Sequence, residues 1–177
     1  MQYINKYRSP LGEITMAADG DKLTGLWFDG QKYFADTLPK EHEEKDLSVF
    51  KQTGEWLDCY FGGGNPDFTP LVLLNGSSFR MEVWEILKNI PRGQVMTYGE
   101  IAKMLAERRG LEKMSAQAVG GAVGHNPISI IVPCHRVVGS DGSLTGYAGG
   151  IEKKLALLSL EGVDVTGLSV PRKGTAL

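Results

Sequence analysis

The sequence has only two cysteines and three histidines among its 177 residues. Cys59 and Cys134 lie far apart, and His42, His125 and His135 are not spaced as paired metal ligands, so a metal site is not expected. Two distant cysteines also make no disulfide framework of the kind that holds small secreted domains together. These counts favour a cytoplasmic protein with reduced thiols.

The sequence also lacks any long apolar run and any excess of positive charge. No segment approaches the length of a membrane span, and residues 1–7 show neither the apolar run nor the cleavage site of a signal peptide. The formal charge is −2, whereas dedicated nonspecific DNA binders are usually basic. If this protein binds DNA, its basic face must therefore be local. The length suffices for one large domain or two small ones.

The first half of the chain reads as a small sheet with a helix. Apolar and polar residues alternate over 11–28, and the Asp19-Gly20-Asp21 and Asp29-Gly30 turn signals predict β-hairpins. Residues 39–48 are expected to form a charged, solvated loop before a helix over about 50–61. A linker follows, and the boundary between the halves is expected near residues 66–76.

The second half is organised around helices. Ser77-Ser78 begins the first, and Thr97 with Glu100 fits a capping box that begins the second. Ser115 begins a third. The second and third helices together favour a helix-turn-helix, although the joint between them, over 109–114, is longer than in the tight form of this motif. A glycine-rich loop over 139–150 precedes a last helix that ends near Glu161-Gly162, and the tail from Ser169 is expected to be loose.

Cys134 is the candidate nucleophile. A lone cysteine is most often a small buried apolar residue, but His135 and Arg136 follow it directly, and cationic neighbours favour the reactive thiolate. Adjacent residues on an extended segment point apart, so contact between His135 and Cys134 requires a helical turn or a bridging water. A third group would orient the base, and Glu161 is a candidate that spacing alone does not place.

The helix over about 116–124 carries an almost bare face. Its residues Ala118, Gly120 and Gly121 let a backbone come close to another surface, and the sequence does not match a phosphate loop or a dinucleotide fingerprint. Packing on a neighbouring helix is the ordinary explanation. A DNA minor groove, roughly 6 Å wide, is another surface that only small residues approach closely.

Taken together, the segments of the second half closely resemble one family, the O6-alkylguanine-DNA alkyltransferases, also called methylated-DNA–protein-cysteine methyltransferases. The match runs in order over about residues 77–162, and its Pro-Cys-His-Arg-Val core is highly specific. The first half matches more loosely, through Ser9-Pro10-Leu11-Gly12 and Tyr60-Phe61. The other matching segments are Phe79 with Val83-Trp84, Ile90-Pro91-Arg92-Gly93, Thr97-Tyr98, Ala118-Val119-Gly120-Gly121-Ala122, Asn126-Pro127, Ile131 to Val138, Gly146-Tyr147-Ala148-Gly149-Gly150 and Leu157-Leu158 with Glu161-Gly162.

The resemblance implies an α/β, ribonuclease-H-like domain over 1–75 and a mostly helical domain with a helix-turn-helix over 76–177. It implies stoichiometric, irreversible transfer of an alkyl group from O6-alkylguanine, and from O4-alkylthymine, to Cys134 after the damaged nucleotide is flipped out of double-stranded DNA. Flipping is needed because a protein thiol hardly reaches a base inside the stack. No cofactor and no membrane are implied, and the protein is expected to be a monomer, with clustering on DNA left open.

Site residues are carried over position by position. Catalytic roles fall on Cys134 as acceptor, His135 as base through a water, Glu161 as its orienting group, Asn126 at the active-site turn and Tyr98 as hydrogen-bond donor to the guanine. Substrate-pocket positions are Val137, Tyr147, Ala148 and Ser129. DNA-binding positions are Thr97, Ser115, Gln117, Ala118, Gly120, Gly121 and Arg136.

Two positions depart from the family pattern. Gln117 stands where the family often has an arginine that fills the space left by the flipped base, so we expect weaker DNA affinity or slower flipping. Ser129 stands where proline is frequent, which is expected to alter tolerance for bulky alkyl groups. The zinc-binding residues of some members are absent.

Two other functions compete with alkyl transfer. Relatives that bind alkylated bases lack the cysteine, so Cys134 disfavours a pure lesion binder. A Cys-His-Glu hydrolase has compatible nucleophile chemistry but predicts multiple turnover, and nothing in the sequence indicates an acyl-substrate pocket.

Overall fold

The computed structural model describes residues 1–169, and the chain divides into two compact units. The first consists of Met1–Leu74 and Pro127–Ile131, and the second of Asn75–Asn126 and the chain from Val132 onward. Beyond Ser169, the expected loose tail lies outside the described residues.

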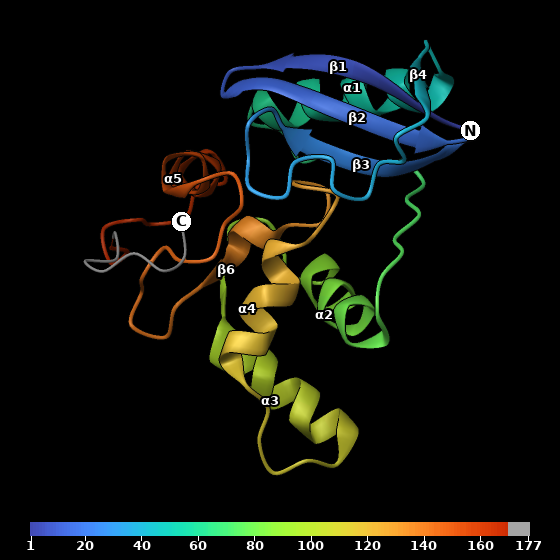
Figure 1. The fold of residues 1–177 in the computed structure, drawn as a ribbon. Coiled ribbons are helices and arrows are strands. Elements are labelled where there is room, and N and C mark those ends of the chain that lie inside the picture. The colour runs from blue at the N-terminus through green and yellow to red at the C-terminus, as the bar shows by residue number, and fades with distance from the viewer. Residues whose placement is uncertain (170–177) are drawn as a thin grey trace. The chain divides into compact units, whose positions relative to one another are not determined.

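The first unit is built on a four-stranded sheet with the order β3-β2-β1-β4 (Figure 1). Both β1–β2 and β2–β3 are antiparallel hairpins, and the turn signal Asp19-Gly20-Asp21 predicted the second of them. The first turns between Ser9 and Gly12 instead, and the strand that ends before Asp29-Gly30 does not pair with the next strand in the chain. The strands are β1 (Gln2–Ser9), β2 (Gly12–Asp19), β3 (Lys22–Phe28) and β4 (His42–Glu44).

The expectation of an uninterrupted loop over 39–48 is wrong, because β4 lies inside it. β4 pairs in parallel with residues 2–4 of β1, and all three of its side chains are exposed. Charged residues without alternation give no strand signal in the sequence. This strand therefore depends on pairing with a distant segment rather than on its own pattern.

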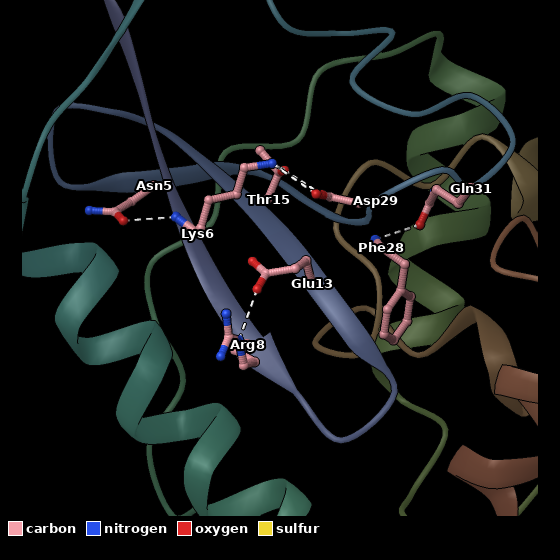
Figure 2. A network of polar contacts seen from close by, with 8 residues as sticks. All are labelled: Asn5, Lys6, Arg8, Glu13, Thr15, Phe28, Asp29 and Gln31. Carbon is pink, nitrogen blue, oxygen red and sulfur yellow. Dashed lines mark hydrogen bonds and ion pairs between the residues drawn. The ribbon is translucent and has the colours of Figure 1, made fainter.

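Helix α1 (Ser48–Phe61) covers one face of this sheet, in agreement with the predicted helix. Phe50, Leu57 and Tyr60 are buried at its contact with the strands. The opposite face carries a polar network in which Lys6 Nζ donates to Thr15 Oγ1 (2.6 Å) and to Asp29 Oδ2 (2.9 Å) (Figure 2).

Segment 127–131 adds to this unit beside β3. The Leu26 amide donates to the Pro127 carbonyl (2.8 Å), and the Ser129 amide donates to the Leu26 carbonyl (2.9 Å). The expected division at 75/76 assigned this segment to the other domain, whereas its main-chain bonds group it with the first unit.

The second unit contains four α-helices, one 3-10 helix and a small parallel pair of strands among its described residues (Figure 1). They are α2 (Ser78–Lys88), β5 (Met96–Thr97), α3 (Tyr98–Arg109), α4 (Ala116–Gly124), η1 (Cys134–Arg136), β6 (Val137–Val138) and α5 (Ile151–Leu160). None of the helices within residues 1–169 is long and apolar enough to cross a membrane.

Local signals set the ends of the helix-turn-helix pair. Thr97 and Glu100 form the predicted capping box at the start of α3, and Gly110 ends it with a φ of 65° that favours glycine. The Ser115 side chain accepts from the Ala118 amide at the start of α4. The two predicted helices are therefore both present, with the long joint between them.

Polar contacts fasten α2 to these two helices. Trp84 Nε1 donates to the Ala122 carbonyl of α4 (2.9 Å), and Arg109 Nε of α3 lies 3.0 Å from Glu82 Oε2. Val83, Trp84, Ile101, Leu105 and Val119 are fully or almost fully buried between α2, α3 and α4.

Candidate active site

Cys134 is the first residue of the 3-10 turn η1 and only 4% exposed. Asn126 holds the chain just before it, because its Nδ2 donates to the Val132 carbonyl (2.8 Å). Burial raises the pKa of the Cys134 thiol, while the Asn126 amide and the charge of Lys154 oppose this. The effect of burial is therefore the larger one despite the neighbouring His135 and Arg136, and the buried thiol needs a base.

His135 is fully buried, and its ring is fixed from one side. His135 Nε2 lies 2.6 Å from Glu161 Oε2, whereas Nδ1 has no hydrogen-bond partner in the described part of the chain. Burial lowers the pKa of His135, partly offset by Glu161, so the ring is neutral near pH 7. A neutral ring that donates from Nε2 to the carboxylate leaves Nδ1 with a lone pair to accept a proton, the tautomer being assigned from the hydrogen bonding.

Arg136 holds the other side of the same carboxylate. Its Nε lies 2.7 Å from Glu161 Oε1, and its Nη2 lies 3.0 Å from Oε2. Nη1 donates to the Ile90 carbonyl (2.6 Å), and the side chain is only 12% exposed. The guanidinium, which the sequence pattern assigned to DNA, is thus committed to contacts within the second unit.

Tyr98, the first residue of α3, is linked to the loop before α5. Its hydroxyl donates to the Thr145 carbonyl (2.5 Å), and Lys154 Nζ donates to the same oxygen (2.8 Å). Lys154 also donates to the Val137 carbonyl. Burial raises the pKa of Tyr98 and lowers that of Lys154 to about 8.

Lys154 was not among the residues that the sequence pattern singled out. A signal was present, since Lys154 falls on the buried stripe that Ile151, Leu155 and Leu158 form on α5. A lysine at a core-facing position of a helix is rare without a partner. The partners, however, come from distant segments and are not visible in the sequence.

The predicted pocket residues are distributed over both units. Val137 is fully buried and Tyr147 is 2% exposed, with its ring 6.5 Å from that of His135 between centroids. Ala148 is half-buried. Ser129 is buried in segment 127–131, which belongs to the first unit.

Helix α4 divides its small residues between two environments. Gly120 lies against Tyr98, since a Cβ there would be 3.9 Å from the tyrosine ring. Gln117, Ala118 and Gly121 are exposed, and a Cβ at Gly121 would meet nothing within 4 Å. Packing on a neighbouring helix thus explains only part of the bare face. The helix-cap residues Thr97 and Ser115 are half-buried and exposed, respectively.

These features define a two-unit protein whose helical unit combines a helix-turn-helix pair with a buried cysteine, histidine and glutamate. Two family models cover most of the chain: the ribonuclease-like domain of 6-O-methylguanine DNA methyltransferase matches residues 2–74, and the DNA binding domain of the same family matches residues 78–163. The chain belongs to the 6-O-methylguanine DNA methyltransferase family, which confirms the resemblance and the fold class.

Individual relatives agree with this assignment. A Haemophilus influenzae methylated-DNA–protein-cysteine methyltransferase is 39% identical over 160 residues, 90% of this chain and 86% of the relative. The crystal structure of Mycobacterium tuberculosis OGT in complex with DNA is similar with a TM-score of 0.78 at 41% identity, covering 90% of this chain and 92% of that one. An O6-methylguanine DNA methyltransferase structure from Methanococcus jannaschii has a TM-score of 0.62 at 26% identity, covering 97% and 99%.

Proposed function

We propose that this protein repairs DNA by direct reversal, taking an alkyl group from O6-alkylguanine, and from O4-alkylthymine, onto Cys134. The observation that carries the proposal is the buried set of Cys134, His135 and Glu161, in which the histidine Nδ1 is left to accept a proton. The relatives' names and the DNA-bound mycobacterial structure support the same activity.

The first step is loss of the thiol proton. Because burial raises the pKa of Cys134, the proton has to pass to a base, and His135 Nδ1 receives it through one bridging water. The resulting imidazolium is stabilised by the Glu161 carboxylate, which Arg136 holds in place. Asn126 positions the turn that carries the sulfur.

In the second step the thiolate attacks the alkyl carbon. An S–C bond forms, the C–O6 bond breaks, and its electron pair passes to the guanine. The Tyr98 hydroxyl, which donates to the Thr145 carbonyl in the free protein, turns its hydrogen bond to the ring as negative charge develops there. The thioether has no leaving group, so each molecule reacts once and transfer is irreversible.

DNA binding is assigned to residues 76–177. The exposed face of α4 at Ala118 and Gly121 fits the narrow minor groove, while Val137, Tyr147 and Ala148 line the pocket for the flipped base. Gln117 fills the space that the base leaves. The protein acts as a monomer in the cytoplasm, where thiols stay reduced.

Protein mass after mixing with duplex DNA that contains O6-methylguanine tests the proposal. We expect a gain of one CH₂ on the peptide with Cys134, in equal amount to the lesion removed, in the Cys59→Ser protein but not in Cys134→Ser. Binding without a mass gain would show a lesion binder and overturn alkyl transfer. Multiple turnover on an ester, lost in Cys134→Ser, would show a hydrolase instead.

A further inference from the structure

Lys154 is a buried charged group that the steps above do not use. It is 0% exposed, yet its ammonium group donates hydrogen bonds to main-chain carbonyls, those of Val137 and Thr145, rather than to a carboxylate. Within residues 1–169 it forms no ion pair with a carboxylate. Taking an ammonium group out of water costs several kcal/mol when no counter-charge compensates it. A buried lysine without an anion therefore calls for a function.

The groups that face Lys154 identify the missing anion. Cys134 and His135 of η1 and Tyr98 of α3 are the titratable groups around it, and its Nζ lies 5.8 Å from the centre of the Tyr98 ring. The Glu161 carboxylate, just past the C-terminal end of α5, is already held by His135 and Arg136.

The charges of Lys154 and Cys134 affect each other. The Lys154 ammonium lowers the pKa of the Cys134 thiol, and the thiolate raises the pKa of Lys154. Burial alone shifts both groups toward their neutral forms. Helix α5, which carries Lys154, also packs against η1, which begins at Cys134. The thiolate that forms during transfer is therefore the anion that completes the environment of Lys154.

We propose that Lys154 is a positioning residue of the transfer site: it holds the carbonyls of Val137 and Thr145 together beside Tyr98, and its fixed positive charge stabilises the Cys134 thiolate as His135 removes the proton. The role given to Lys154 rests on the proposed function, because the thiolate matters only if Cys134 accepts an alkyl group. The experiment below measures the reactivity of the thiol without DNA, so its result does not depend on that function. Lys154 keeps its own proton throughout, so the thiol proton still passes to His135. Its contribution is electrostatic and greatest in a site from which water is excluded.

The alternative is that Lys154 only holds the carbonyls of Val137 and Thr145 together, which a neutral hydrogen-bond donor would also do. Lys154→Gln separates the two roles, because its amide keeps N–H donors and removes the charge. Lys154→Met removes both. Lys153→Met is the matched control, because it removes the same charge from the adjacent position of α5, where the side chain is only half-buried.

The test measures the reactivity of Cys134 toward iodoacetamide without DNA, as a function of pH, in a Cys59→Ser background that leaves a single thiol. We expect Lys154→Met and Lys154→Gln to raise the pH midpoint of alkylation by about one unit or more, and to slow it about tenfold near neutral pH. Lys153→Met should match the parent. A folded Lys154→Gln protein with an unchanged midpoint would overturn the proposal in favour of that alternative.

A second measurement needs no substitution at Lys154. In the Cys59→Ser protein with ¹³C-labelled lysine, Cys134 is blocked with iodoacetamide and the NMR signal of Lys154 is followed against pH. We expect the block to lower the pH at which this signal titrates, because the thiolate is removed. An unchanged titration would overturn the proposal even if both Lys154 variants misfold.

The repair function and the role of Lys154 can fail separately. Absence of methyl transfer from DNA disproves the repair function, whereas an unshifted thiol midpoint disproves the role of Lys154.

Discussion

The Nε2 atom of His135 lies 2.6 Å from Glu161 Oε2, and both side chains are completely buried. This contact assigns one ring nitrogen to the carboxylate and leaves Nδ1 as the only ring atom that can take the thiol proton. In the proposed reaction, the thiol proton therefore passes to the ring nitrogen that lies opposite the hydrogen bond to Glu161.

The pH dependence of alkyl transfer follows from this environment. Burial lowers the pKa of His135 below its ordinary value, so the folded protein keeps the ring neutral at a pH where a free histidine is already half protonated. We expect the single-turnover rate constant to be constant down to about pH 6.5 and to fall only below it. Rapid-quench assays from pH 5 to 8 measure this. A midpoint at or above pH 6.5 would contradict the assignment of a buried, neutral base.

Replacement of His135 tests the same base directly. His135→Gln keeps a polar side chain of similar size but cannot accept the proton at this pH, and we expect the rate constant to fall by roughly 10²–10⁴. Affinity for undamaged DNA, measured by fluorescence anisotropy, should stay the same. An unchanged rate constant in a folded variant would mean that Cys134 loses its proton by another route.

Arg136 is expected to act on stability rather than on DNA. Arg136→Met leaves the buried Glu161 carboxylate without its bidentate partner, and breaking a buried pair in this way costs about 3–5 kcal/mol of unfolding free energy. Urea denaturation measures that loss. A DNA-contacting arginine would give the opposite pattern, with unchanged stability and a salt dependence of DNA binding reduced by about one unit of slope. Arg136→Lys keeps the positive charge but cannot bind the carboxylate with two nitrogens, so its stability should lie between those of the parent and of Arg136→Met.

How far the sequence determines these features depends on how local the signals are. The capping box of Thr97 and Glu100 and the glycine at 110 lie within the segments they terminate, so the ends of α3 were predictable. Strand β4 and segment 127–131 depend on main-chain bonds to β1 and β3, which no local pattern encodes.

The site residues divide in the same way. The Pro-Cys-His-Arg-Val core identified Cys134 and His135, but it did not show that Arg136 turns toward Glu161, which is 25 residues away in the sequence. The contacts of Lys154 with Val137 and Thr145 were likewise not visible, because they form only when α5 packs against η1 and its neighbouring loop.

Gly146 should be essential for the position of Tyr98. A Cβ at this residue would collide with the Tyr98 hydroxyl, and its φ of +78° already disfavours other residues. We expect Gly146→Ala to lower the transfer rate constant as strongly as Tyr98→Phe, because both take the tyrosine hydroxyl away from its proposed position beside the flipped guanine. Gly150→Ala is the matched control, since Gly150 also has a positive φ (+94°) but nothing within 4 Å of its Cβ. Equal rate losses in the two glycine variants would attribute the effect to backbone strain alone.

Gln117 lies exposed in the first turn of α4 and brings no charge to DNA. We expect Gln117→Arg to tighten binding to duplex DNA and to speed transfer from O6-methylguanine at low protein concentration, because a cation in the vacated base position is also attracted by the phosphates around it. The slope of binding affinity against salt concentration should steepen by about one unit. If binding and rate both stay the same, the interpretation of Gln117 as the residue that fills the vacated base position is wrong.

The exposed small face of α4 is tested by a substitution with opposite effects on stability and on binding. Gly121 is an interior residue of this helix with open space around its Cβ, so Gly121→Ala should raise the unfolding free energy by up to about 1 kcal/mol. On DNA the added methyl group would stand between the helix backbone and the groove, and we expect binding to weaken roughly tenfold, the equivalent of about 1.4 kcal/mol. Gly54→Ala in α1 offers the same gain in helix propensity in the first unit, with its nearest contact at 3.9 Å, and should leave DNA affinity unchanged. A Gly121→Ala protein that is more stable and binds DNA as before would show that this face of α4 does not enter the groove.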